Sequence, residues 1–271
     1  MAAVAEAGST VIAFDVVVSE PERNPIDDAL QRAEQQGYRF SVPEWRDDID
    51  ADTQFALSLG LMDTVLGFFF LDQALTNGQL PQPLEQWSKT QADNIIHIAK
   101  PGDAANISTL QHSATHAGFV TTFVDGDGVV RRSPLLIAHQ QAVYASLSVA
   151  TVMTYLLADN VDIVTVPIGK HRAIRHISLL DSYIRTDAAG RAIVPYKGGK
   201  GSFPYLSAAN LLRGDFAAAQ LAGAIVLLGT SAQGLADRRT TPWPTQYPGV
   251  DVNANLIAGL LHGHFPNRRA W

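Results

Sequence analysis

Two apolar runs constrain the fold of this chain more than any other feature of its sequence. The run VIAFDVVV, residues 11–18, is nearly continuous and rich in β-branched side chains, and TVLGFFFLD, residues 64–72, has the same character. A strand that is apolar at successive residues offers no face to water, which is typical of a sheet covered on both sides. These runs predict buried strands that need helices on either face.

Helical patterns alternate with strands at both ends of the chain. Residues 24–37 begin with the capping residue Asn24 and a proline, and they close at Gly37. Further helices are expected over 48–60, 146–158, 207–214 and 250–263, and strands in HISLLD, YIRTD, RAIVPY and GAIVLLGTSA. Residues 73–101 are expected to form a long loop with short elements. The whole predicts an α/β fold, with a mixed sheet flanked by helices, a central β-hairpin and long loops.

The stretch FVDGDGVVRRSP, residues 123–134, is where that central hairpin is expected. It joins GFVTTFV to VVRRSPLLIA through a Gly/Asp turn. A calcium loop is disfavoured because Val129 takes the third ligand position and no glutamate closes the loop. We interpret Asp125 and Asp127 as turn residues, and we expect one of the arginines that follow to pair with them. Because side chains alternate along a strand, at most one of Arg131 and Arg132 should point at a pocket.

Composition excludes several classes of protein. The net charge is −6 and no long basic run occurs, which argues against a nucleic-acid binder. The chain has no cysteine, so disulfides and thiolate metal sites are excluded, and we expect neither a metal nor a cofactor. No apolar run approaches the roughly 18 residues of a membrane span, and the first residues do not form a signal peptide. The short helix expected before the first strand suggests a fragment of a longer protein.

Polar residues gather where strands end. In GTSAQG, residues 229–234, Thr230 and Ser231 follow a strand at the end where open α/β sheets bind ligands. The second glycine is one residue too late for a hydrolase nucleophile elbow. A soluble α/β hydrolase-like enzyme using Ser231, with Asp237 and His262, stays an alternative. Asp15, within an apolar strand, needs a polar partner.

Taken in order, several segments resemble one known family. They are VIAFDVVVSEP, GFVTTFVDGDGVVRRSPLL, YASLSVAT, IVPYKG, FPYLSAANLLRG, LAGAIVLLGTSAQGLADRRTTP and YPGVDVNANLIAGLL. Each is weak alone, but together they extend over nearly the whole chain. The chain resembles the type 2 CHASE domain, a cyclase/histidine-kinase-associated sensory extracellular domain.

The resemblance implies a single extracytoplasmic sensor domain over residues 1–271, without the strand that normally opens the domain and without the flanking membrane helices. It implies a bacterial membrane receptor, a homodimer, whose small-molecule or protein signal regulates a cytoplasmic cyclase or kinase. This chain would then not be an enzyme, although its parent would be one. The resemblance also implies recurrent polar positions at Asp15, Asp125, Asp127, Arg131, Ser146, Tyr196, Gly229, Thr230, Ser231 and Asp237. The expected ligand-binding residues among them are Asp15, Arg131, Tyr196, Thr230, Ser231 and Asp237. A dimerisation module without a ligand is a further alternative.

Overall fold

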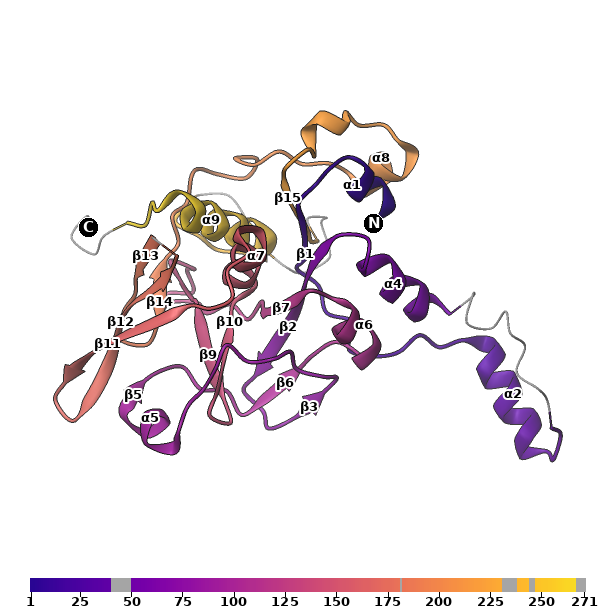
Figure 1. The fold of residues 1–271 in the computed structure, drawn as a ribbon, viewed down its shortest axis with the longest axis horizontal. Coiled ribbons are helices and arrows are strands. Elements are labelled where there is room, and N and C mark those ends of the chain that lie inside the picture. Colours follow the sequence, from indigo (N-terminus) through magenta and orange to yellow (C-terminus); the bar gives the residue numbers. More distant parts are fainter. Residues whose placement is uncertain (40–49, 181, 231–237, 244–246, 267–271) are drawn as a thin grey trace.

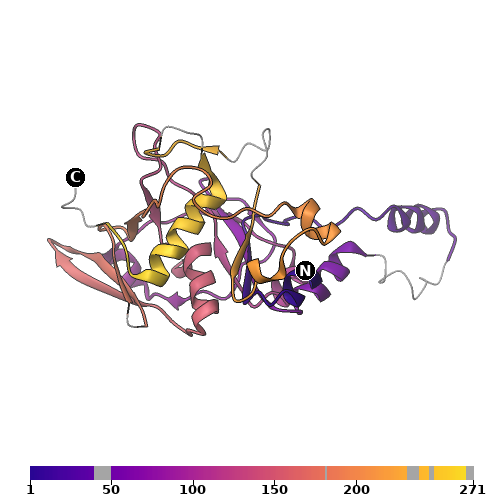
Figure 2. The same ribbon diagram turned by 90° about the horizontal axis from the view of Figure 1, so that it is seen from above.

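The structure is a computed structural model that describes residues 1–39, 50–180, 182–230, 238–243 and 247–266. The described chain is elongated, with a central sheet between helix α2 (Pro25–Gln35) at one end and a sheet formed mainly by residues 162–185 at the other (Figures 1 and 2). The mixture of parallel and antiparallel sheets with covering helices confirms the expected α/β class.

The central sheet is built on the two apolar runs. Strands β15 (Ile225–Leu228), β1 (Val11–Phe14), β2 (Asp63–Leu71) and β7 (His116–Phe119) are parallel neighbours in that order. The far end of β2 pairs antiparallel with β6 (Gly102–Ala104), which pairs with β3 (Thr76–Asn77). All four residues of β1 are buried, which confirms the expected two-sided burial for this strand. The strand ends at Phe14 rather than continuing to Val18, and Phe69 of β2 is exposed.

Different helices cover the two faces of this sheet. Val11 and Ala13 pack with residues of α7 (Leu147–Leu156) and α9 (Gly249–His262). Ile12 and Phe14 point the other way, toward α1 (Ala2–Glu6), α4 (Ala51–Leu59) and α6 (Ser108–Ser113). This alternation follows from the two-residue period of a strand. It places α7 and α9 side by side on one face (Figures 1 and 2).

The remaining strands form smaller sheets. Strands β11 (Asp162–Ile168), β12 (His171–Leu179) and β13 (Ser182–Arg185) are antiparallel, and β5 (Ile95–Ile96) pairs with β12. Strand β10 (Ala142–Ala145) lies between β9 (Leu136–His139) and β4 (Glu85–Gln86). Two-stranded pairs join β8 (Arg132–Pro134) to β14 (Arg191–Ile193), and β16 (Arg238–Arg239) to β17 (Tyr247–Pro248).

Most expected helix boundaries are confirmed by their caps. The side chain of Asn24 accepts a hydrogen bond from the backbone of Ile26 at the start of α2, and Ser146 does the same for Val149 in α7. Gly214 adopts a positive φ and closes α8 (Ala208–Arg213), which precedes the 3₁₀ turn η1 (Ala218–Gln220). The long loop contains only α5 (Lys89–Asn94) and the short strands β3, β4 and β5.

The expected hairpin around DGDG is wrong in its pairing. The tight turn is present, since the backbone N–H of Asp125 donates to the carbonyl of Val129. However, β7 joins the central sheet while β8 pairs with β14, so that Ser133 lies opposite Ala192. The central sheet is covered on both faces and has no place for a strand carrying two arginines. The hairpin of this region lies just beyond, at β9–β10, where Gln140 and Gln141 form the turn.

Candidate functional site

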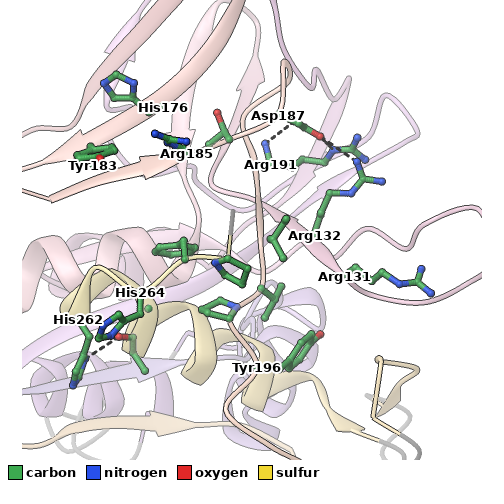
Figure 3. Close-up of a pocket in the computed structure, with 18 of the residues that line it drawn as sticks. Arg131, Arg132, His176, Tyr183, Arg185, Asp187, Arg191, Tyr196, His262 and His264 are labelled. Atoms are coloured by element: carbon green, nitrogen blue, oxygen red, sulfur yellow. Dashed lines mark hydrogen bonds and ion pairs between the residues drawn. The ribbon is translucent and has the colours of Figure 1, made fainter. Parts of the chain in front are cut away.

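A groove of about 1700 Å³ lies beside the C-terminal half of α9. One wall is the outer face of β12–β13, where His176, Ser178 and Tyr183 lie. A second wall comes from the β8–β14 pair and the segment 194–197 that follows it. The third comes from the end of α9 and the residues after it, including His262 and His264 (Figure 3). Segments far apart in the sequence therefore meet at one cavity.

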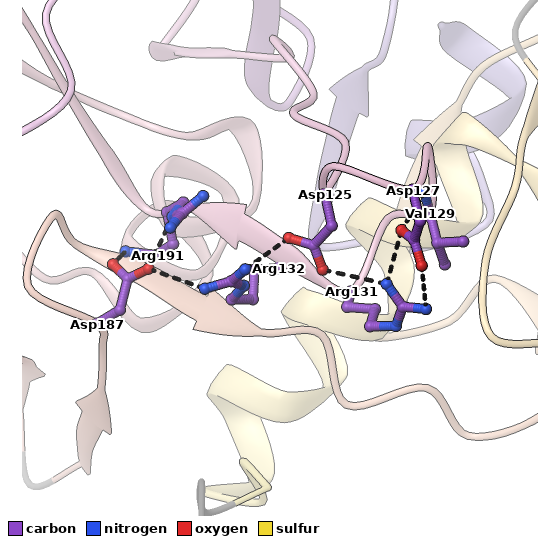
Figure 4. Close-up of polar contacts among 7 residues, drawn as sticks. All are labelled: Asp125, Asp127, Val129, Arg131, Arg132, Asp187 and Arg191. Carbon is purple, nitrogen blue, oxygen red and sulfur yellow. Dashed lines mark hydrogen bonds and ion pairs between the residues drawn. The ribbon is translucent and has the colours of Figure 1, made fainter.

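A chain of ion pairs holds the β8–β14 wall together (Figure 4). Asp187 accepts from Nε of Arg191 at 2.7 Å and lies 3.5 Å from Arg132. Arg132 donates to Asp125 at 2.7 Å, and Asp125 also contacts Arg131 at 3.4 Å. Arg131 then binds both carboxylate oxygens of Asp127, at 2.9 and 2.8 Å. Alternating acids and arginines thus fix the positions of three guanidinium groups.

Both arginines of the RR pair line the groove, so the expectation that at most one would do so is wrong. Arg131 precedes the first residue of β8, where strand alternation does not apply. Asp125, at the start of the turn, contacts both side chains and holds them on one side. The expected pairing of an arginine with the turn aspartates is confirmed twice.

The bidentate contact between Arg131 and Asp127 also keeps both side chains ionised. Hydrogen bonds from Arg131 lower the pKa of Asp127 to about 2, from a usual value of 3.8. Hydrogen bonding to Asp127 in turn raises the pKa of Arg131. Both groups are therefore charged at neutral pH. Because they are exposed to solvent, this pair orders the turn more than it stabilises the fold.

Tyr196 connects the groove to the buried end of α9. Its hydroxyl donates to the carbonyl of Val130 at 2.8 Å, and its ring packs edge-on against Tyr247 at 5.3 Å. Burial raises the pKa of Tyr196, so the hydroxyl stays protonated and keeps this bond. Tyr247 accepts from the side chain of Asn255, which also accepts from the backbone N–H of Lys197. The wall at 194–197 is therefore fixed to α9.

The six expected ligand-binding residues fall into separate places. Arg131 and Tyr196 line the groove. Asp15 and Thr230 instead follow β1 and β15, which are parallel and in register from Val11 to Phe14. The Asp15 carboxylate accepts from Asn253 of α9 at 3.4 Å, which confirms that it has a polar partner. Ser231 and Asp237 lie outside the described residues.

Several groove residues were missed by reasoning from the sequence, namely Arg185, Asp187, Arg191 and His176. The sequence did carry a signal for Asp187 and Arg191. Asp187 precedes Arg191 by four residues across a tight turn, as Asp127 precedes Arg131. The position of β12–β13 beside that turn had no such signal, because it depends on long-range packing.

Of the three residues in the hydrolase alternative, His262 alone lies among the residues that the structure describes. His262 donates from Nδ1 to the carbonyl of Ala258 at 2.9 Å and is exposed at the end of α9. Within the described ranges, no three His, Asp or Glu side chains are grouped so that they could hold a metal ion. None of the helices in the described part of the chain is both long and apolar enough to cross a membrane.

Comparison with known proteins gives one match. The family model described as CHASE2 domain matches residues 1–271, the whole chain. No significant match is found among curated proteins or among solved structures. CHASE2 domains are extracytoplasmic and sensory rather than catalytic. The chain therefore belongs to the CHASE2 domain family of sensory extracellular domains.

Proposed function

We propose that this chain is the ligand-sensing domain of a bacterial transmembrane signalling protein, and that it regulates a cytoplasmic nucleotide cyclase or kinase. The groove carries the proposal, because it is large enough for a ligand and is walled partly by the last helix of the domain. Pockets that bind drug-sized ligands usually measure about 300–1,000 Å³. A small molecule or a segment of a partner protein would fit.

The proposed mechanism is a shift between two arrangements of the domain. A ligand in the groove would contact Arg131 and Tyr196 on one wall and the end of α9 on another. Since α9 packs on α7 and the central sheet, a change in its position would be passed through the domain. The segment after Leu261 would transmit it to membrane helices in a homodimeric receptor. Such a shift requires that the ligand bind one arrangement more tightly than the other.

Asp15 and Thr230 remain proposed ligand-contacting residues at a second place, the carboxyl ends of β1 and β15. Ser231 and Asp237 remain proposed ligand-contacting residues outside the described part of the chain. Asp15 is already engaged by Asn253, which also accepts from Ser148 of α7. A ligand there would compete with contacts that join α9 to the sheet. Thr230→Ala and Arg131→Ala, made separately in the parent receptor, distinguish this place from the groove. Altered signalling with Thr230→Ala alone indicates the strand ends, and altered signalling with Arg131→Ala alone indicates the groove.

The reading frame of the parent gene tests the receptor proposal. The proposal predicts an apolar run of about 20 residues upstream, further apolar runs downstream, and then a catalytic domain. A frame without such runs on either side would contradict it.

A further inference from the structure

The groove carries a charge opposite to that of the whole chain. Among the described residues, its lining includes six lysines and arginines and two carboxylates, Asp125 and Asp187. The difference is an excess of four positive charges, whereas the chain has a net charge of −6. A concave surface lined by one sign of charge concentrates ions of the other sign. The groove would therefore attract an anion even though the domain as a whole is acidic.

Arg185 supplies a cation that no described residue engages. It lies on β13 directly opposite His176 of β12, and its side chain is exposed to the groove (Figure 3). Among the residues that the structure describes, none forms an ion pair or side-chain hydrogen bond with Arg185. A guanidinium group presents five N–H donors in a planar fork that matches carboxylate and phosphate oxygens. No side chain in the described part of the chain uses these donors.

Arg191 supplies donors that are already oriented. Only its Nε is engaged by Asp187, at 2.7 Å, and its side chain is 30% exposed. Asp187 is itself fixed, because one of its oxygens accepts from the backbone N–H groups of Ala189 and Arg191. The terminal nitrogens of Arg191 make no hydrogen bond with the described residues. A cation held in place before binding loses less entropy when a ligand arrives.

The rest of the lining indicates an organic ligand. Tyr183, Tyr196, Trp243 and Phe265 contribute aromatic surface to the same groove. Pockets for small organic molecules combine such surface with a few placed polar groups. Aromatic rings can pack against the carbon skeleton while arginines bind the charged ends.

We propose that the groove binds a multivalent oxyanion, a small molecule with two or more carboxylate or phosphate groups, held by Arg185 and Arg191. This inference rests on the proposed sensory function and names the class of its ligand. Neither the net charge nor the family predicts it.

Titration calorimetry of the 271-residue chain tests the inference, with citrate and tripolyphosphate as probes and glucose and spermidine as uncharged and cationic controls. At low salt, we expect saturable binding of at least one anion and of neither control. Arg185→Gln should weaken that binding about tenfold or more, the usual effect of losing a charged hydrogen-bond donor. Arg213→Gln is the matched control, since it removes the same charge from an exposed position on α8 outside the groove.

Two results would overturn the inference: no saturable binding of either anion, or equal weakening by Arg185→Gln and Arg213→Gln. Equal weakening by the two substitutions would mean that anion binding depends only on the net charge of the chain. Failure of the sensory function is a separate result, because it is read from the parent receptor. If a substitution that fills the groove changes the output of the receptor while neither anion binds, the domain is a sensor for a ligand of another class.

Discussion

Replacing Asn255 by leucine removes the contacts that fix one groove wall to α9. Asn255 is fully buried, and its side chain donates to the hydroxyl of Tyr247 and the carbonyl of Asp251, each at 2.7 Å. It also accepts from the backbone N–H of Lys197 at 2.8 Å. Leucine has a similar volume, so no large cavity forms, but the N–H of Lys197 loses its partner.

The expected cost follows from these contacts. Each of the three lost hydrogen bonds costs about 1 kcal/mol, and water can replace part of the bond to the N–H of Lys197, because that residue is exposed. The hydroxyl of Tyr247 keeps its bond to the carbonyl of Gly198, which limits the loss. We therefore expect Asn255→Leu to lower the free energy of unfolding by about 2–4 kcal/mol. Urea unfolding followed by circular dichroism measures it as a lower midpoint at unchanged slope.

Asn210→Leu is the matched control, because Asn210 is exposed on α8, away from the groove. It should change the free energy of unfolding by less than about 0.5 kcal/mol. The reasoning is refuted if Asn255→Leu costs no more than this control. In that case the segment 194–197 is not held by Asn255, and the wall of the groove is less fixed than described.

Three further predictions follow from other parts of the domain. Gly118→Ala should lower the free energy of unfolding by several kcal/mol, because a Cβ there would lie 2.6 Å from the backbone of Leu147, and thermal unfolding measures this loss. Burial raises the pKa of Asp251 above 3.8, so its ionisation weakens the folded state as pH rises through that higher pKa. The free energy of unfolding of Asp251→Asn, relative to that of the unsubstituted protein, should therefore increase from about pH 4 upward. Parallel urea titrations measure both, and a difference between them that does not change with pH would contradict this. A fluorophosphonate probe should leave Ser231 unlabelled, as read by mass spectrometry, and labelling would restore the hydrolase alternative.

The elements of the fold were predictable where local chemistry decides them. Continuous apolar residues in β1 and β2 indicated two-sided burial, and Asn24 and Ser146 marked helix starts through their side-chain oxygens. Strand pairing was not predictable in the same way. The DGDG turn suggested a hairpin, but the partner of β8 is β14, whose position depends on contacts between distant segments.

The candidate site was predictable only in part for the same reason. Arg131 and Tyr196 were identified from motifs, and both line the groove. Arg185 and His176 belong to strands that the sequence pattern predicts, but the pattern does not say where their sheet lies in the fold. A cavity made by several separate segments leaves no continuous pattern in the sequence.

The most direct test of the central claim is the output of the parent receptor when the groove is filled. Ser178→Trp places a large side chain on the β12 face that lines the groove. Ser108→Trp makes the same change at an exposed residue of α6, on the other side of the central sheet. With both variants folded, as judged by melting temperature, we predict that Ser178→Trp alters the cyclase or kinase activity of the receptor and Ser108→Trp leaves it unchanged. Equal activity in both variants and the unsubstituted receptor would contradict the claim that this groove is the sensory site.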